Sequence, residues 1–454
     1  MKNRYKNKNV LIIGLKKSGK SALQLLLSKG AFCYVFDDDP NVLKQFAGNG
    51  NFCTVPYVNQ DVIKIMDYLV ISPGVSIFSE YVKLAGLFGV KVVGELELGL
   101  EYAKGKIIGV TGTNGKTTTC NLIYHILKLA KKSCSLCGNV GDPICENLLP
   151  FKSNYVVEMS SFQLESATKI CPDIAVILNI TPNHLDRHLT FANYQNAKFN
   201  IFKNLKKNGI LVLNFDDKVL NLLKNVPKMP KIVWISQKSK VDGYFVCDGK
   251  IVFKNKKTEQ VIADIGGAKL IGKHNIYNML CAVAVGKKLK IKNSVIQHGL
   301  LTFSPLKHRL QFVKNVNGVD YINDSKSTTP DSTITAINSV DRPTILLLGG
   351  SDKNTSFDNL AKKIKKAKTI KNVVVCGATS KKIVGALKKA NYKNFRVATN
   401  FDNALCLATN LAVQGDVVLL SPACASFDFF DCFEKRGDKF IEYVNKLKEV
   451  EIEK

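Results

Sequence analysis

The chain has 454 residues, a formal net charge of +28 and 46% hydrophobic residues. This length is too great for one ordinary hydrophobic core and predicts two to four domains, and the composition is globular rather than disordered. The lysines are scattered along the whole length, without a basic tail or interleaved aromatic residues. We therefore interpret the charge as a solvated surface and expect no nucleic-acid partner.

The apolar segments are short, and the longest, such as residues 345–348, have the length of a strand rather than of a membrane span. Near the N-terminus, Lys16 and Lys17 closely follow the apolar residues 10–13, which is unlike a signal peptide. Most of the 13 cysteines lie in apolar segments, as reduced thiols do. We expect a cytoplasmic protein without stable membrane insertion.

The first part of the chain alternates predicted strands and helices. Residues 9–14 are predicted to form a strand that leads through a glycine-containing turn into a helix over residues 19–28. A second strand, residues 32–36, ends in three aspartates, and a buried strand over residues 68–72 precedes a Pro-Gly turn. This pattern is typical of a βαβ unit.

The rest of the chain repeats this alternation. A strand over residues 106–111 and a helix over residues 116–129 open a second block, and a third begins near Pro305. Further strands are predicted at residues 155–158, 174–179, 209–213, 344–348, 372–376 and 416–420. The fold class is therefore α/β, with three consecutive domains. We expect an N-terminal Rossmann-like domain, a central parallel sheet like that of P-loop ATPases and a C-terminal Rossmann-like domain, over residues 1–104, 105–304 and 305–454.

The strongest local signal is GVTGTNGKTT at residues 109–118. A predicted strand leads into a glycine-rich loop, and a helix begins at Lys116. Backbone N–H groups of such a loop bind phosphates, while Lys116 would neutralise the β- and γ-phosphates and Thr117 would bind Mg²⁺. Five residues separate Gly109 from Gly115, one more than in the standard loop, and an ordinary strand–turn–helix connection is the alternative.

A second glycine-containing turn, from Gly14 to Gly19, follows the first strand. Lys16, Ser18 and the helix N-terminus could bind a diphosphate, and Asp37 at the end of the next strand could reach a ribose hydroxyl. This pattern is weak by itself, because a plain strand-to-helix turn would look the same.

Two further side chains follow predicted strands of the central block. Glu158 ends a strand opposite the expected position of the phosphate loop, where a carboxylate is a natural Mg²⁺ ligand. His184 comes after the next strand; a single histidine is more often structural, but its place in a nucleotide-binding block favours a functional role.

Short motifs continue in order through all three blocks: TGTNGKT (111–117), EMSSFQLE (158–165), HLDR (184–187), YQNAK (194–198), GKHNIYN (272–278), HR (308–309), NDSKST (323–328), GGSDK (349–353), SPACASFD (421–428) and EKRG (434–437). With these motifs the sequence resembles the Mur ligase family over essentially its whole length.

The resemblance implies an ATP-dependent acid–D-amino-acid ligase of peptidoglycan precursor synthesis. The expected substrates are ATP, D-glutamate and UDP-N-acetylmuramoyl-L-alanine, joined through an acyl phosphate with two Mg²⁺ ions, and the expected state is a monomer. One alternative is another ligase of the superfamily, such as a folylpolyglutamate synthase, although the stretch at residues 423–428 argues against it. The other is a nucleotide-binding module without catalytic activity.

The resemblance also implies roles for individual side chains. Catalysis would depend on Lys116, Glu158, His184 and Lys198, and Mg²⁺ would bind Thr117, Glu158, His184 and Lys198, the last as a carbamate. ATP would contact Gly112, Thr113, Asn114, Gly115, Lys116, Thr117, Thr118, Asn275, Asn278, Arg309, Asp324 and Lys326. The UDP-substrate would contact Leu15, Lys16, Ser18, Asp37, Gly74, Asn139, Ser160, Gln163 and His184. D-Glutamate would contact Thr328, Lys353, Ser426 and Phe433; for Ser426, capping of a following helix is the alternative.

Overall fold

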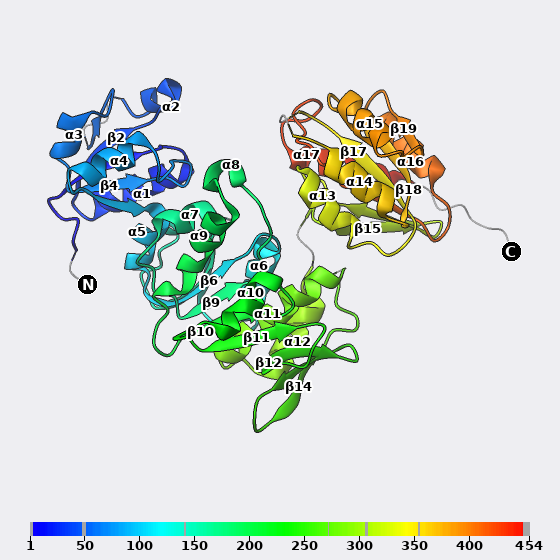
Figure 1. The fold of residues 1–454 in the computed structure, drawn as a ribbon, viewed down its shortest axis with the longest axis horizontal. Coiled ribbons are helices and arrows are strands. Elements are labelled where there is room, and N and C mark those ends of the chain that lie inside the picture. Colours follow the sequence, from blue (N-terminus) through cyan, green and yellow to red (C-terminus); the bar gives the residue numbers. More distant parts are fainter. Residues whose placement is uncertain are drawn as a thin grey trace. The chain divides into compact units, whose positions relative to one another are not determined.

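The computed structural model describes residues 3–47, 51–139, 142–270, 272–304, 307–352 and 355–447 (Figure 1). The chain divides into two compact units. The first consists of Met1–Ala268 and Asn275–Phe303, and the second of Lys269–His274 and Ser304–Lys454. No helix in the described ranges is both long enough and apolar enough to cross a membrane.

The first unit begins with a parallel five-stranded sheet of order β3-β2-β1-β4-β5. Its central strand is buried on both faces, as strands of parallel sheets are. Val10 and Ile12 pack towards α1 and α5, and Leu11 and Ile13 towards α3 and α4. The elements are β1 Asn9–Ile13, α1 Lys17–Ser28, β2 Phe32–Phe36, α2 Pro40–Lys44, β3 Cys53–Thr54, α3 Gln60–Lys64, β4 Tyr68–Ile71, α4 Glu80–Leu87, β5 Lys91–Gly94 and α5 Glu95–Tyr102.

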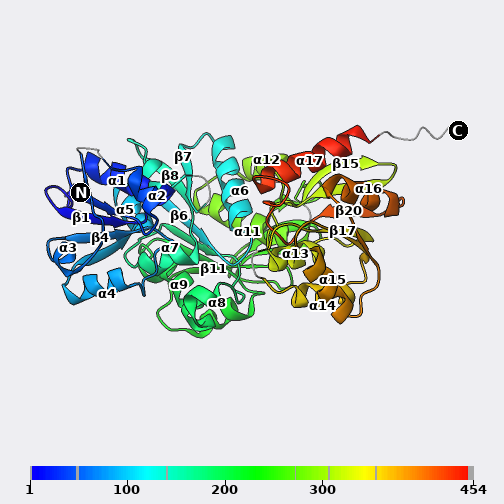
Figure 2. The ribbon, with the colours of Figure 1, turned by 90° about the horizontal axis from the view of Figure 1, so that it is seen from above.

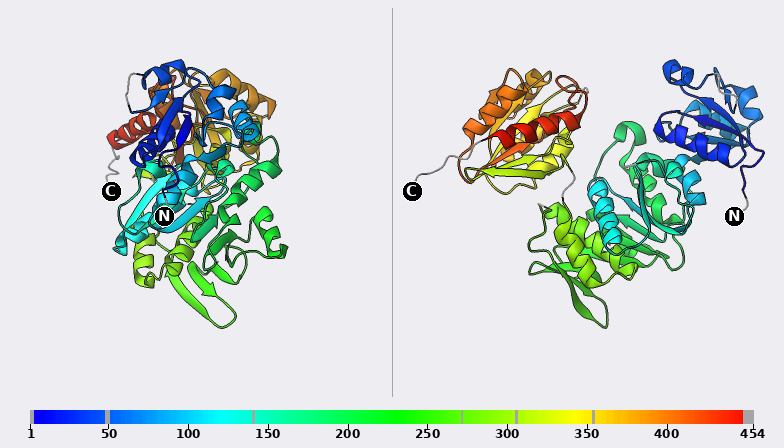
Figure 3. Two further views of the ribbon diagram at one scale, coloured as in Figure 1. Left: turned by 90° about the vertical axis from the view of Figure 1, so that its left-hand side faces the viewer. Right: turned by 180° about the vertical axis from the view of Figure 1, so that it is seen from behind.

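The same unit contains a nine-stranded sheet of order β14-β13-β12-β11-β10-β9-β6-β8-β7. It is parallel from β7 to β12, and β12, β13 and β14 pair antiparallel at one edge (Figure 3). The strands are β6 Gly105–Thr111, β7 Cys134–Gly138, β8 Ser153–Glu158, β9 Ile174–Ile177, β10 Ile210–Asn214, β11 Ile232–Ser236, β12 Gly243–Cys247, β13 Lys250–Lys254 and β14 Glu259–Asp264. The α-helices are α6 Lys116–Leu129, α7 Ser161–Ser166, α8 Leu185–His188, α9 Phe191–Lys203, α10 Lys218–Asn221, α11 Lys273–Lys288 and α12 Asn293–Thr302.

The second unit is built on a six-stranded sheet of order β15-β16-β20-β17-β18-β19, in which β15 and β16 pair antiparallel and the other neighbouring strands pair parallel. Helices α13, α14 and α15 pack on one face, and α16 and α17 on the other (Figure 2). The elements are β15 Gln311–Val316, β16 Val319–Asn323, α13 Pro330–Ile337, β17 Thr344–Gly349, α14 Asp358–Lys366, β18 Ile370–Cys376, α15 Ser380–Lys389, β19 Phe395–Val397, α16 Phe401–Leu411, β20 Val417–Leu420 and α17 Phe433–Lys446.

The predicted fold class is confirmed, since the described residues form three mostly parallel sheets with helices packed against them. The boundary predicted near residue 304 lies close to the division between the two units. The separate roles assigned to the three predicted domains stay predictions.

Candidate active site

The connection between β6 and α6 is shaped by a glycine that no other residue could replace without strain. Gly115 has φ of 86°, and a Cβ atom there would lie 2.5 Å from Oδ1 of Asn278. Asn278 accepts a hydrogen bond from the hydroxyl of Thr119 at 3.1 Å and donates one to Oδ1 of Asn275 at 2.7 Å. The two asparagines predicted to contact ATP are therefore held against the first turn of α6.

Two lysine amines converge on this loop. Nζ of Lys116 donates to the carbonyl oxygens of Gly112 and Thr113, both at 2.9 Å. Nζ of Lys198, from α9, donates to the same Gly112 oxygen at 2.9 Å and lies 3.4 Å from the Thr111 hydroxyl. Lys198 is only 1% exposed, and burial, followed by the charge of Lys116, lowers its pKa well below the usual value. A buried lysine beside a second cation is thus disposed to carry an uncharged amine.

Glu158 ends β8, the strand beside β6, and its backbone pairs with Val110. Nδ2 of Asn139 donates to one carboxylate oxygen at 2.7 Å, while the other, Oε2, is buried without a hydrogen-bond partner among the described residues. A buried carboxylate oxygen of this kind is costly unless a donor or cation joins it. Thr117, also buried, opens the helix after the neighbouring strand. These oxygen donors fit a Mg²⁺ ion, which prefers carboxylates and hydroxyls.

A cavity of about 560 Å³ lies where the first sheet meets residues of the second. It is lined by the turn after β1, the end of β2 and the loop after β4, and its volume is typical of a ligand site. Six residues predicted to contact the UDP-substrate line it: Lys16, Ser18, Asp37, Gly74, Asn139 and Gln163. The structure therefore brings together side chains far apart in the sequence.

The three other residues of that predicted set do not line the cavity. Leu15 is buried, and its N–H donates to Oδ2 of Asp37 at 2.6 Å. Ser160 caps α7 reciprocally with Gln163, so that the serine positions the glutamine that lines the cavity. His184 lies before α8, where its ring contacts Phe162 at a centroid distance of 4.9 Å.

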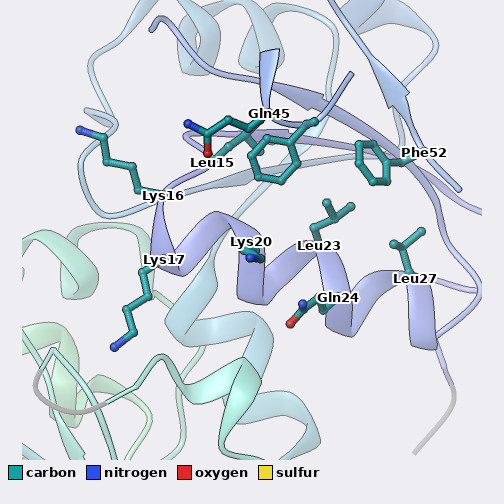
Figure 4. Close-up of a pocket in the computed structure, with 10 residues that line it drawn as sticks. Leu15, Lys16, Lys17, Lys20, Leu23, Gln24, Leu27, Gln45 and Phe52 are labelled. Carbon is teal, nitrogen blue, oxygen red and sulfur yellow. The ribbon is translucent and has the colours of Figure 1, made fainter. Parts of the chain in front are cut away.

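A second cavity of about 450 Å³, which the sequence did not reveal, runs along α1 (Figure 4). The side chains of Leu23, Leu27 and Phe52 form its apolar wall. Lys16 and Lys17 line both this cavity and the larger one. The two cavities therefore share the basic residues at the start of α1.

In the second unit, Asp324 lies just after β16 and is fully buried. Its Oδ1 accepts from the N–H of Leu310 at 3.1 Å, and its Oδ2 from the hydroxyl of Ser421 at 2.8 Å. Burial raises its pKa to about 6. Nearby, the amine of Lys326 lies 5.5 Å from the centre of the Phe433 ring.

The burial of Asp324 predicts a specific pH dependence. Its pKa is about 6 in the folded protein against 3.8 for the ordinary side chain, so the folded state binds more protons between these values. Its contribution to the free energy of unfolding is complete below pH 4 and is lost as pH rises through 6. We expect this contribution to fall by about 2 kcal/mol from pH 4 to pH 7. Calorimetry of the second unit's unfolding transition should show this decrease in wild type but not in Asp324→Asn. If the stability of both proteins depended on pH in the same way, the assignment of the effect to Asp324 would be contradicted.

Ser426 is 1% exposed, and its hydroxyl has no hydrogen-bond partner within the described part of the chain. Its carbonyl accepts from the N–H groups of Phe429 and Phe430. The next helix, α17, begins at Phe433 with Cys432 as its N-cap. The alternative that Ser426 caps the following helix is therefore wrong, and its buried hydroxyl is left available to a ligand.

The other residues predicted to contact D-glutamate are distributed as follows. The N–H of Thr328 donates to the Lys326 carbonyl, and the Phe433 carbonyl accepts from the Ser325 hydroxyl at 2.8 Å. Lys353 lies outside the described residues. Arg436, within the EKRG motif but not chosen from it, is buried and binds the backbone carbonyls of Ser325, Cys424 and Ala425.

These features define a class: a multidomain α/β protein whose central sheet carries a glycine-rich loop followed by lysine and threonine. Comparison with known proteins identifies a family within this class. The model for the Mur ligase MurD-like N-terminal domain matches residues 8–94, that for the Mur ligase middle domain residues 110–286, and that for the Mur ligase glutamate ligase domain residues 308–424. The chain belongs to the Mur ligase family.

Similar proteins of known name span almost the whole chain. The UDP-N-acetylmuramoylalanine–D-glutamate ligase of Caldicellulosiruptor saccharolyticus is 37% identical, with 97% of this chain and 99% of the relative covered. The protein of the same name from Clostridioides difficile is 37% identical, with 98% of this chain and 99% of that protein covered.

Solved structures share the fold at lower identity. UDP-N-acetylmuramate–alanine ligase MurC from Thermotoga maritima has a TM-score of 0.58 and 19% identity, with 97% of this chain and all of that chain covered. MurF from Acinetobacter baumannii has a TM-score of 0.60 and 16% identity, with 97% of this chain and 92% of that chain covered.

Proposed function

We propose that this chain is an ATP-dependent ligase that joins the amine of D-glutamate to the carboxylate of UDP-N-acetylmuramoyl-L-alanine. The observation that carries the proposal is the convergence of Lys116, Lys198 and a partly unsatisfied Glu158 at the glycine-rich loop. The name shared by relatives that match this chain along nearly its full length supports the choice of substrates.

The proposed reaction activates a poor electrophile. A carboxylate oxygen of the UDP-substrate attacks the γ-phosphorus of ATP, and ADP leaves. The free amine of D-glutamate attacks the carbonyl carbon of the resulting acyl phosphate and an N–C bond forms. Phosphate leaves with the former C–O bonding pair, and the nitrogen loses a proton to solvent. Lys116 and the loop N–H groups would stabilise the negative charge that accumulates as two anions approach.

Mg²⁺ would supply further charge neutralisation at the phosphates. We assign one ion to Thr117 and Glu158, and a second to His184 and a carbamylated Lys198, since an ammonium group cannot bind a metal. The chain's other ATP contacts would come from Gly112, Thr113, Asn114, Gly115, Thr118, Asn275, Asn278, Arg309, Asp324 and Lys326.

The cavity of about 560 Å³ supports a site for the UDP-substrate. In this proposal Lys16, Ser18 and the α1 N-terminus bind the diphosphate. Asp37 already accepts hydrogen bonds from the N–H groups of Leu15 and Asp39, so it also fixes the shape of the turn. Gly74, Asn139, Ser160, Gln163 and His184 would complete the site, and Thr328, Lys353, Ser426 and Phe433 would bind D-glutamate.

The decisive experiment is phosphate release by the purified chain with ATP and Mg²⁺. We expect release only when D-glutamate and UDP-N-acetylmuramoyl-L-alanine are both present. Release with a folate substrate and L-glutamate would support a folylpolyglutamate-type ligase instead. Nucleotide binding without release under any of these conditions would support a non-catalytic module.

Ser426→Ala is expected to weaken the use of D-glutamate while leaving ATP almost unaffected. The buried hydroxyl of Ser426 would donate to a carboxylate, and a hydrogen bond to a charged group contributes about 1.5–3 kcal/mol. The apparent affinity for D-glutamate should therefore fall roughly ten- to a hundredfold. Steady-state kinetics with each substrate varied in turn would measure it; equal losses for ATP and D-glutamate would refute the assignment.

A further inference from the structure

Arg187 connects the segment containing His184 to the wall of the larger cavity. It lies on α8 and reaches the loop after β4, where Nη2 donates to the Val75 carbonyl at 2.8 Å and Nη1 to the Gly74 carbonyl at 3.0 Å. Both Gly74 and Val75 line the cavity of about 560 Å³. The guanidinium group of Arg187, which lies on a helix beside the nine-stranded sheet, therefore fixes a loop of the five-stranded sheet.

The same guanidinium group is also held by a buried carboxylate. Nε and Nη2 of Arg187 lie 3.3 and 3.1 Å from Oε2 of Glu165 on α7. The other oxygen of Glu165 lies 2.9 Å from Nδ1 of His188, whose Nε2 lies 3.0 Å from the Ser161 hydroxyl. The side chains of Arg187, Glu165 and His188 are only 15%, 6% and 1% exposed. A planar fork held by a buried carboxylate is pre-organised, which a flexible lysine would not be.

Phe162 joins this network to His184. Its ring lies 4.9 Å from the ring of His184, and the guanidinium carbon of Arg187 lies 5.0 Å from its centre. The next residue, Gln163, lines the cavity. A shift of Arg187 would therefore move both the cavity wall and the packing of His184.

We propose that Arg187, held by Glu165, is a positioning residue that couples binding of the UDP-linked substrate to the placement of His184. This inference rests on the proposed function, which puts the sugar nucleotide in the cavity and His184 at the metal. Arg187 acts through the Gly74 and Val75 carbonyls and through Phe162, and contacts no reacting atom. Its guanidinium fork, rather than its charge alone, is the required feature, because it serves two carbonyls and a carboxylate together.

The test compares Arg187→Ala, Arg187→Lys and Glu165→Gln with wild type. The KM for the UDP-substrate should rise roughly ten- to a hundredfold in Arg187→Ala and less in Arg187→Lys, which keeps the charge but not the fork. KM values for ATP and D-glutamate should change less than about twofold. Glu165→Gln, which keeps the shape of the side chain, should give an intermediate rise. Arg342→Ala is the matched control, since Arg342 is ion-paired with Asp320 in the second unit, and it should match wild type.

Calorimetric titration of UDP-N-acetylmuramoyl-L-alanine without ATP gives a readout that needs no turnover, and should show the same order of affinities. The inference is overturned if Arg187→Lys or Glu165→Gln, when folded, binds the UDP-substrate as wild type does. It is also overturned if the KM values of all three substrates rise together with a lower Tm. Wild-type binding without phosphate release would instead contradict the proposed reaction, while the order of affinities among the variants would still decide the role of Arg187.

Discussion

Replacing Lys116 with alanine is expected to lower phosphate release by a factor of roughly 100 to 1,000, because one fixed charge aimed at the transferring phosphate is lost. The fold should persist, since the amine of Lys116 donates to carbonyls of its own loop, and the Gly112 carbonyl keeps its hydrogen bond from Lys198. Initial rates at saturating substrates, together with circular dichroism and Tm, would measure both effects.

Lys128→Ala provides the control for this substitution. Lys128 is exposed near the other end of α6, so its variant should retain wild-type rates. If Lys116→Ala kept more than about a tenth of the wild-type rate with an intact fold, the glycine-rich loop could not be the phosphate site that we propose.

Elements with an apolar run or a glycine-rich start signal were the part of the fold that the sequence predicted best. Residues 32–36 and 116–129 match β2 Phe32–Phe36 and α6 Lys116–Leu129 at both ends. The residues of β2 are apolar throughout, and all but Phe32 are at least partly buried in the parallel sheet, while α6 starts where its glycine-rich loop ends. The predicted order of strands and helices followed from these segments.

The antiparallel edge of the central sheet was not predicted. Strand β14, Glu259–Asp264, has only two buried residues, and β13, Lys250–Lys254, begins and ends in lysine. An edge strand exposed on much of its surface lacks both an apolar run and a clean alternation. The strands β15 and β16 were missed as well, although the motif after β16 was recognised.

For Glu158 and His184 the prediction followed from the rule that polar residues at the carboxyl ends of parallel strands gather at one edge, whereas most other site residues were assigned through the resemblance. That rule placed Glu158 opposite the phosphate loop, and the structure has it at the end of β8, the strand beside β6. Arg187 was passed over although it belongs to the same short motif as His184, because its partners Glu165 and Gly74 lie 22 and 113 residues earlier in the chain. Contacts of this kind depend on tertiary packing that no local pattern encodes.

Lys198 is expected to carry a carbamate in the active enzyme. Its amine is buried, and burial with the nearby charge of Lys116 lowers its pKa well below the usual value, so the free base is accessible nearer neutral pH than for an exposed lysine. The amine nitrogen attacks the carbon of CO₂, an N–C bond forms, one C=O pair moves to oxygen and the proton leaves to solvent. The product is an anion, and it would bind the metal that an ammonium group would repel.

The sign of the pH dependence follows from this chemistry. Below the lowered pKa the amine is an ammonium group that cannot attack CO₂, so the carbamate should be lost as pH falls and kept as pH rises. Carbon-13 NMR with labelled bicarbonate should show a carbamate signal in wild type at neutral pH. The signal should be absent from Lys198→Ala, whose phosphate release should fall by roughly a hundredfold or more through loss of charge stabilisation at the phosphates.

Lys203→Ala is the matched control, because Lys203 is exposed at the end of the same helix and should keep both the signal and the activity. The carbamate would also explain why a lysine is buried beside another cation. Adding an anionic group converts the repulsion between Lys198 and Lys116 into attraction and supplies charge opposite the incoming metal. Full activity in CO₂-free buffer, with no carbamate signal in metal-loaded enzyme, would rule this out and leave the second metal without an anionic ligand from α9.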